Sequence, residues 1–212
     1  MSIPASSGIS FETAEREFRE AWEEPLHTRF DLPPVDVNKV LRDGYRVKPE
    51  RPLTRALIWE METRKAWDPL SYIPYVVSEG RSWGRHTLQD GSERFCRSSL
   101  QLGWITPERG RILEDVFISD VRQCVFFFGR PQMTGEDGEE LRASGFQPLF
   151  HVEHGVGGPE EEPLNLWRIV LLTPKHDVRY IEPFEQMVRA GLLPGFIEIY
   201  IERDLHMQLG RI

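Results

Sequence analysis

The chain has 212 residues, of which 40% are hydrophobic and 28% are charged, the composition of one globular domain or two small ones. Its formal net charge is −8 and it contains no long basic cluster, so we expect no nucleic-acid partner. No apolar run approaches the ~20 residues of a membrane helix. The first residues also lack the features of a secretory signal, and we expect no association with a membrane.

The two cysteines, Cys96 and Cys124, are too few for a disulfide framework and are not spaced like metal ligands. Both lie in apolar runs that resemble strands. We therefore expect two buried free thiols in a reducing compartment, which favours the cytoplasm.

Helical patterns dominate the first third of the chain. Apolar residues recur at spacings of three and four across residues 10–24, which predicts an amphipathic helix that ends at Pro25. The proline-rich segment 29–52 is expected to be irregular structure wrapped on the domain, with one helical turn in residues 37–41. Residues 52–67 return to helical spacing and predict a second helix.

The middle of the chain changes to a period of two, with many branched and aromatic residues, which predicts strands. The expected strands are residues 92–104, 111–118, 121–129, 146–154 and 164–172. Residues 133–145 are expected to be a polar excursion, and residues 155–163 an exposed loop.

The C-terminal residues 180–210 fit two patterns. Their isoleucines alternate as in a strand, whereas Leu193, Ile197 and Ile201 follow a period of four. We favour a helix that is interrupted or kinked at residues 191–194, because glycine and proline both weaken a helix interior.

Strands grouped between terminal helices predict an α+β fold, in which a curved antiparallel β-sheet wraps around a long C-terminal helix. An N-terminal helix and short helices complete it. We expect a flexible tail in residues 1–9 and a single small-molecule-binding domain in residues 10–212. The concave face of such a sheet leaves a cavity, so the expected partner is a hydrophobic small molecule. The sequence also allows a homodimer.

One histidine pair, HVEH at residues 151–154, lies in a predicted strand. There His151 and Glu153 point to one face and His154 to the other. His151 and Glu153 could act as a base and its orienting acid, or as two metal ligands. The alternative is a half-exposed strand end beside a loop.

Aromatic residues exceed what the core of a small sheet needs, which favours a broad hydrophobic cavity. Core packing is the alternative for each of them taken singly. The residues expected to bind substrate are Trp67, Tyr75, Trp83, Trp104, Phe126, Phe128, Trp167 and Met187.

Two segments of the chain, RKAWDPLSYIPYV (residues 64–76) and EPFEQMVRAGLLPGFIEIYIE (residues 182–202), resemble hydrolases that cleave a carbon–carbon bond in diacetylphloroglucinol and phloretin. The resemblance implies the START-like helix-grip (SRPBCC-type) fold. It also implies a zinc ion in the cavity, held partly by the motifs Trp-x-Pro-x-x-His and His-x-x-x-Glu.

This sequence departs from both motifs. The first matches at Trp67 and Pro69, but Tyr72 stands at its histidine position. The second matches at Glu185, while Ile181 stands at its histidine position. Zinc needs three or four converging nitrogen, sulfur or carboxylate ligands, so we expect no bound metal and no cofactor.

We therefore expect a metal-free enzyme of secondary metabolism that cyclises a polyketide- or terpenoid-like substrate, by a pericyclic or another route. The candidate catalytic residues are Tyr72, Glu185, His151 and Glu153. Tyr72 would donate a hydrogen bond to a carbonyl, and Glu185 would point into the cavity with a raised pKa. One alternative is a carbon–carbon bond hydrolase whose metal site is rebuilt from His151, Glu153 and Glu185. Another is a non-catalytic carrier of an apolar ligand.

Overall fold

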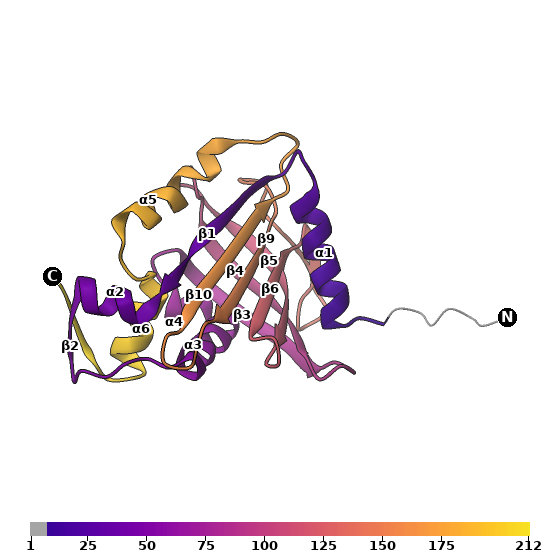
Figure 1. The fold of residues 1–212 in the computed structure, drawn as a ribbon. Helices are drawn as coiled ribbons and strands as arrows, with labels where there is room; N and C mark the ends of the chain where they lie inside the picture. The colour runs from indigo at the N-terminus through magenta and orange to yellow at the C-terminus, as the bar shows by residue number, and fades with distance from the viewer. Residues whose placement is uncertain (1–7) are drawn as a thin grey trace.

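The computed structural model describes residues 8–212 and centres on a seven-stranded sheet in which all neighbouring strands are antiparallel (Figure 1). The strand order is β1-β10-β9-β6-β5-β4-β3. The strands are β1 (Thr28–Asp36), β3 (Val77–Thr87), β4 (Glu93–Leu102), β5 (Arg109–Ser119), β6 (Cys124–Gly129), β9 (Phe150–Gly157) and β10 (Leu164–Leu171).

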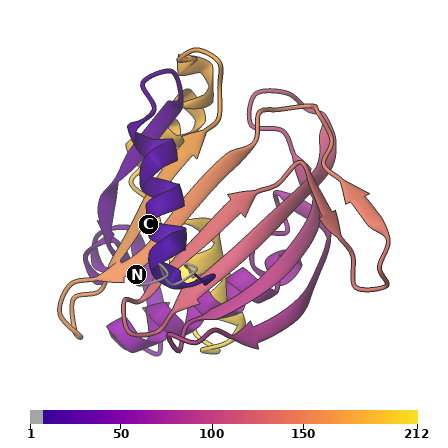
Figure 2. The ribbon, with the colours of Figure 1, turned by 90° about the vertical axis from the view of Figure 1, so that its right-hand side faces the viewer.

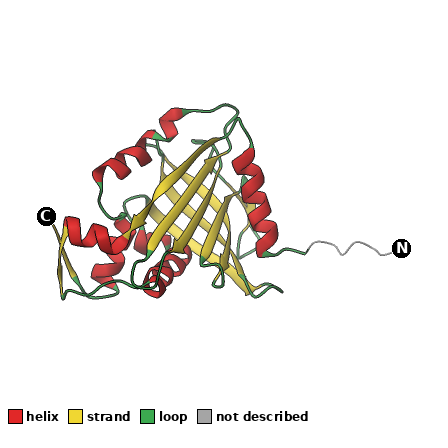
Figure 3. Cartoon of the chain, viewed as in Figure 1, coloured by secondary structure: helices red, strands yellow, loops and turns green. Residues whose placement is uncertain are grey.

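Helices lie on both faces of this sheet (Figure 3). They are α1 (Phe11–Glu23), α2 (Val37–Gly44), α3 (Arg55–Trp67), α4 (Pro69–Tyr72), α5 (Glu182–Ala190), α6 (Gly195–Arg203) and a 3-10 turn at Val178–Tyr180. Two further strand pairs join β2 (Tyr45–Lys48) to β11 (Gln208–Arg211) and β7 (Gln132–Thr134) to β8 (Glu140–Arg142). Within residues 8–212 no helix is both long and apolar enough to cross a membrane.

The N-terminal helix α1 covers one face of the sheet, here called the outer face (Figure 2). The Ser10 side chain accepts a hydrogen bond from the backbone N–H of Thr13 and caps the helix. The apolar stripe of α1 packs against Phe126 and Phe128, with Phe18 and Phe126 ring centres 5.2 Å apart. α1 therefore covers the apolar part of the outer face around Phe126 and Phe128.

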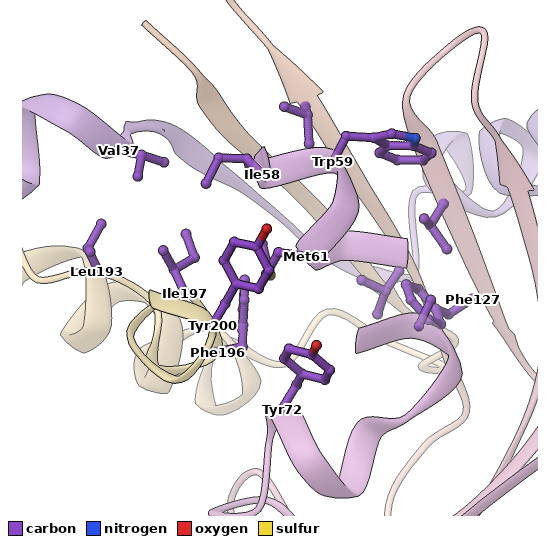
Figure 4. Packing of buried hydrophobic residues seen from close by; sticks show 14 of the residues in the cluster. Val37, Ile58, Trp59, Met61, Tyr72, Phe127, Leu193, Phe196, Ile197 and Tyr200 are labelled. Carbon is purple, nitrogen blue, oxygen red and sulfur yellow. The ribbon is translucent and has the colours of Figure 1, made fainter. Parts of the chain in front are cut away.

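The opposite, inner face carries the main core, which α3 and α6 complete (Figure 4). α6 is amphipathic, and four of its nine residues are buried. They are Phe196, Ile197, Tyr200 and Ile201. A curved antiparallel sheet that holds a C-terminal helix on its inner face is the helix-grip arrangement that the sequence predicted.

The predicted interruption of the C-terminal helix is confirmed. α5 ends at Ala190 and is capped by Gly191, whose φ of 63° is the left-handed conformation that favours glycine, and α6 begins after Pro194. The prediction that segment 29–52 is irregular is wrong, because it contains β1, α2 and β2. Pro33 and Pro34 fall at a register shift in β1, an edge strand, where a missing backbone donor is tolerated.

Three smaller points concern the tail, one loop and the two cysteines. The expected tail, residues 1–9, lies almost wholly outside the described residues. The expected excursion at residues 133–145 holds the β7–β8 hairpin. Cys96 and Cys124 are free, as expected, but only partly buried.

Asn38 ties together three segments that are distant in the sequence. Its amide nitrogen donates to the carbonyl oxygens of Leu53 and Glu161, both at 2.8 Å, and its amide oxygen accepts from the Leu53 N–H at 2.9 Å. The side chain is buried. α2, the start of α3 and the β9–β10 loop therefore share one clamp.

We expect Asn38→Ala to lower the free energy of unfolding by about 2–4 kcal/mol, because it removes the partners of three backbone groups. Urea unfolding measures the change. Lys39→Ala, at the exposed neighbouring position, should change it by less than about 0.5 kcal/mol. Equal losses in the two variants would contradict the clamp.

Candidate functional site

A cavity of about 350 Å³ opens between the inner face of the sheet, the α4–β3 connection and helices α5 and α6. Its walls are mostly apolar and include the aromatic side chains of Trp104, Phe127, Phe150, Trp167, Phe184 and Phe196. Trp104 packs against Phe150 and Phe184, with ring centres 4.6 and 5.1 Å apart. Such walls suit a flat or flexible apolar molecule.

Strand alternation decides which side chains reach this cavity. In β6, Phe127 lines the cavity, so its neighbours Phe126 and Phe128 lie on the outer face. In β9, His154 lies two residues from Val152, and both line the cavity. The period of two therefore brings one histidine, His154, to the inner face.

A cluster of four side chains, here called the polar floor, lies at one side of the cavity. Lys65 of α3 and His154 of β9 line the cavity, and Glu62 of α3 and Asn165 of β10 lie behind them. Lys65 Nζ lies 2.5 Å from Glu62 Oε2 and 2.5 Å from His154 Nδ1. Asn165 donates to Glu62 Oε1 at 2.7 Å. All four side chains are buried, so each depends on the others in place of water.

A second ion pair borders the floor. Arg97 Nε donates to Glu114 Oε2 at 2.7 Å, and Arg97 Nη1 donates to the carbonyl oxygen of Ala66 at 3.0 Å. The guanidinium carbon lies 4.6 Å from the centre of the Phe127 ring. Arg97 and Glu114 both line the cavity, so its polar part carries two paired cations and two paired anions.

The charges on the polar floor follow from burial and from close partners. Burial lowers the pKa of Lys65, Glu62 opposes this, and the result is about 8. Burial alone would raise the pKa of Glu62, but the Lys65 charge is the largest opposing cause and the pKa is about 2. Burial and the Lys65 charge lower the pKa of His154 to about 4. At neutral pH the cluster is mainly an ammonium, a carboxylate and a neutral imidazole.

This charge state fixes the tautomer of His154. An ammonium can only donate, so His154 Nδ1, 2.5 Å from Lys65 Nζ, is the acceptor and the imidazole proton is on Nε2. Nε2 has no hydrogen-bond partner within residues 8–212. Trp167 stacks on this imidazole at 4.7 Å, and its buried Nε1 also lacks a partner among the described residues. Both residues line the cavity, so we expect these two N–H groups to donate to a bound ligand.

Four of the eight expected substrate-binding residues line the cavity: Tyr75, Trp104, Trp167 and Met187. The other four do not. Phe126 and Phe128 lie under α1, and Trp83 is buried with Leu113 and Leu141 in a separate cluster. Trp67 is 36% exposed and packs against Phe95. These four expectations are wrong because the number of aromatic residues in a strand does not show which face of the strand is the inner one.

His151 and Glu153 share one face, as expected, but it is the outer face. Glu153 pairs with Arg168, and the His151 ring packs edge-on against Phe128 at 5.0 Å. Burial raises the pKa of Glu153 and lowers that of His151 to about 4. The base-and-acid pair expected from the HVEH motif therefore does not face the cavity, whereas His154 does.

Tyr72 and Glu185 also lie elsewhere than expected. The Tyr72 hydroxyl donates to Asp204 Oδ2 at 2.5 Å, and this residue is not among those that line the cavity. The Glu185 side chain is 47% exposed and pairs with Arg189 at 3.4 Å. The prediction that Glu185 points into the cavity is wrong, because Phe184 and Met187 occupy the helix face that does.

The residues present do not fit the zinc ion that the hydrolase resemblance implies. Tyr72 and Ile181 replace two imidazoles, and the set His151, Glu153 and Glu185 is split between the outer face and the surface of α5. Among the described residues, no three histidine, cysteine, aspartate or glutamate side chains gather closely enough to hold a metal ion.

Comparisons with known proteins give only distant likenesses. No protein-family model and no curated protein matches the sequence. A ginseng major latex-like protein 151 from Panax ginseng is 12% identical with a TM-score of 0.40, over 80% of this chain and 99% of that one. The di-domain ARO/CYC StfQ from the steffimycin biosynthetic pathway is 12% identical with a TM-score of 0.43, over 92% of this chain and 60% of that one. Such distant likenesses transfer neither activity nor ligand to this chain.

We expect Tyr72→Phe to lower the free energy of unfolding by about 1.5–3 kcal/mol, because it removes a hydrogen bond to a carboxylate that joins α4 to α6. Urea unfolding measures the loss. The affinity for the apolar dye 8-anilinonaphthalene-1-sulfonate should stay unchanged, since Tyr72 does not line the cavity. Unchanged stability together with weaker dye binding would contradict this assignment.

The two buried histidines make stability depend on pH. The unfolded chain has the ordinary histidine pKa of 6.5, and folding lowers it to about 4 at His151 and His154. Between these values the unfolded chain binds more protons, so the free energy of unfolding should fall as the pH drops from 6.5 towards 4. Glu62 contributes only below its ordinary pKa of 4.5.

Urea unfolding at several pH values above 4.5 isolates this contribution from that of Glu62. His151→Gln and His154→Gln should each make the decline shallower. If the free energy of unfolding of both variants fell with pH as steeply as that of the parent protein, neither histidine would be held neutral by the fold.

Proposed function

We propose that this protein is an enzyme that binds a hydrophobic, carbonyl-bearing molecule of polyketide or terpenoid type and catalyses its intramolecular cyclisation. The observation that carries the proposal is the imidazole of His154. Lys65 fixes its tautomer, so that an N–H donor is available at the polar floor of an aromatic cavity.

The aromatic walls would supply the first part of catalysis. Ring closure requires that the two ends of a flexible chain meet, and a cavity of about 350 Å³ restricts a bound chain to folded conformations. Holding reacting groups in contact removes much of the entropic part of a barrier. Phe184 and Met187 of α5 close one side of this space.

The polar floor would supply the second part. The Nε2–H of His154 would donate to the carbonyl oxygen that gains negative charge as the ring bond forms. A neutral imidazole donor keeps its proton in this role, and the Lys65 ammonium behind it adds a fixed positive charge. Glu62 acts as a positioning residue, because it holds the ammonium in place at 2.5 Å.

The resemblance to diacetylphloroglucinol and phloretin hydrolases supports the class of ligand rather than the reaction. Those enzymes act on phenolic ketones, which suit aromatic walls and a hydrogen-bond donor. Since the zinc ligands are replaced, we propose that activity requires no metal or cofactor. Two free thiols support a cytoplasmic location.

A carrier of an apolar ligand is the second candidate, and one observation favours it. The ionised groups at the cavity are paired with each other, Lys65 with Glu62 and Arg97 with Glu114. Such a cavity can bind a polar group without removing a proton from it. A carrier would release every compound unchanged.

The test is incubation with a panel of open-chain hydrophobic ketones, followed by chromatography with mass detection. Cyclisation gives an isomer of the substrate or a product that has lost one water. We expect His154→Leu to reduce turnover by ~10²-fold or more, because it removes the donor, whereas His154→Gln should retain part of it. Tyr72→Phe, outside the cavity, should turn over at the parental rate.

Equal turnover by His154→Leu and the parent protein would contradict the role of the imidazole. Release of every compound unchanged would favour the carrier, provided that the compounds bind. Loss of turnover after chelation would favour a metal-dependent hydrolase.

A further inference from the structure

One of the four lysines of this chain differs from the others in its surroundings. Lys39, Lys48 and Lys175 are exposed, whereas Lys65 is 4% exposed and lines the cavity. The proposed function uses only its charge. Its amine nitrogen is also the strongest nucleophile that the polar floor can offer once a proton has left.

The neighbours of Lys65 can accept and return protons. His154 Nδ1 lies 2.5 Å from Nζ and Glu62 Oε2 lies 2.5 Å from Nζ. The centre of the Phe196 ring lies 3.8 Å from Nζ, and both residues line the cavity. Burial and the nearby Arg97 lower the pKa of Lys65, Glu62 raises it, and at about 8 a useful fraction is neutral amine near neutral pH.

We infer that Lys65 forms a protonated imine with an aldehyde or ketone bound in the cavity. This inference rests on the proposed function in one respect, since both place a carbonyl group at the polar floor. It goes further in assigning a covalent bond to a named atom, Lys65 Nζ.

The reaction balances with the groups present. One proton of the Lys65 ammonium passes to His154 Nδ1, and the freed electron pair forms a C–N bond to the carbonyl carbon. The carbonyl oxygen takes the Nε2 proton of His154. A second proton then moves from nitrogen to the new hydroxyl group of the addition product, water leaves, and the nitrogen electron pair closes the C=N bond. The net change is ammonium plus carbonyl to protonated imine plus water.

The surroundings suit the product as well as the free lysine. The protonated imine keeps the positive charge of the ammonium, so Glu62 and the Phe196 ring still face a cation. No net charge is created or lost in a buried place. After the reaction the His154 proton is on Nδ1, which lies 3.1 Å from Glu62 Oε2 and can donate to it.

The experiment is reductive trapping with 2-naphthaldehyde. The intact protein is incubated with a limiting amount of the aldehyde and then reduced with sodium borohydride. Its mass is measured by mass spectrometry, and the protein is then digested for peptide mapping. We expect one adduct per chain, whose added mass is that of the aldehyde less one oxygen. It should map to Lys65 and form at least about tenfold faster than adducts at exposed lysines.

Two variants test whether the adduct forms at Lys65. Lys65→Arg keeps the charge beside Glu62 but cannot form an imine, so it should lose the adduct. Lys39→Arg makes the same change at an exposed lysine and should keep it. The peptide map of the parent protein shows which lysine carries the adduct, so the test does not depend on either variant. Adducts spread evenly over Lys39, Lys48 and Lys175, with none at Lys65, would overturn the inference.

The outcomes separate this inference from the proposed function. A trapped adduct at Lys65 without turnover of the ketone panel supports the imine and counts against cyclisation. Turnover of a ketone that leaves no trapped adduct at Lys65 overturns the imine and leaves cyclisation in place.

Discussion

The buried ion pair between Glu62 and Lys65 is the constraint on which the site depends. The two residues lie three apart on α3 and are almost wholly removed from water, which costs several kcal/mol per ion unless partners repay it. The partners come from β9 and β10, through His154 and Asn165. α3 is therefore held against these two strands, and Phe196 of α6 covers the ammonium.

The two faces of the sheet have different roles because side chains alternate along each strand. On the outer face, α1 fills the space above Phe126 and Phe128, and the charges there, such as Glu153 with Arg168, meet across neighbouring strands. On the inner face, the space between the strands and α5 is not filled, and the polar floor lies at its base. A one-residue change of register would exchange the two sets.

Much of the fold could be predicted because the spacing of apolar residues follows burial along a helix, as in α1 and α6. β1 could not, since its proline pair is typical of a loop unless the strand is known to be an edge.

The polar floor could not be predicted either. Glu62 and Lys65, three apart on a helix, look like a solvated pair. Side chains alternate between the two faces of a strand, so His151 and His154 must point to opposite faces. The sequence does not show which of these faces is the inner one.

A contribution to the stability of the fold does not by itself explain why the polar floor is present. Replacing a buried ion pair by well-packed apolar residues is often neutral or stabilising, so a pair such as Lys65 with Glu62 is weak evidence of a structural role. Here a second pair, Arg97 with Glu114, lies beside the first, and Lys65, Arg97 and Glu114 line the same apolar cavity. Fixed dipoles and charges in a dry space favour a ligand on which charge develops.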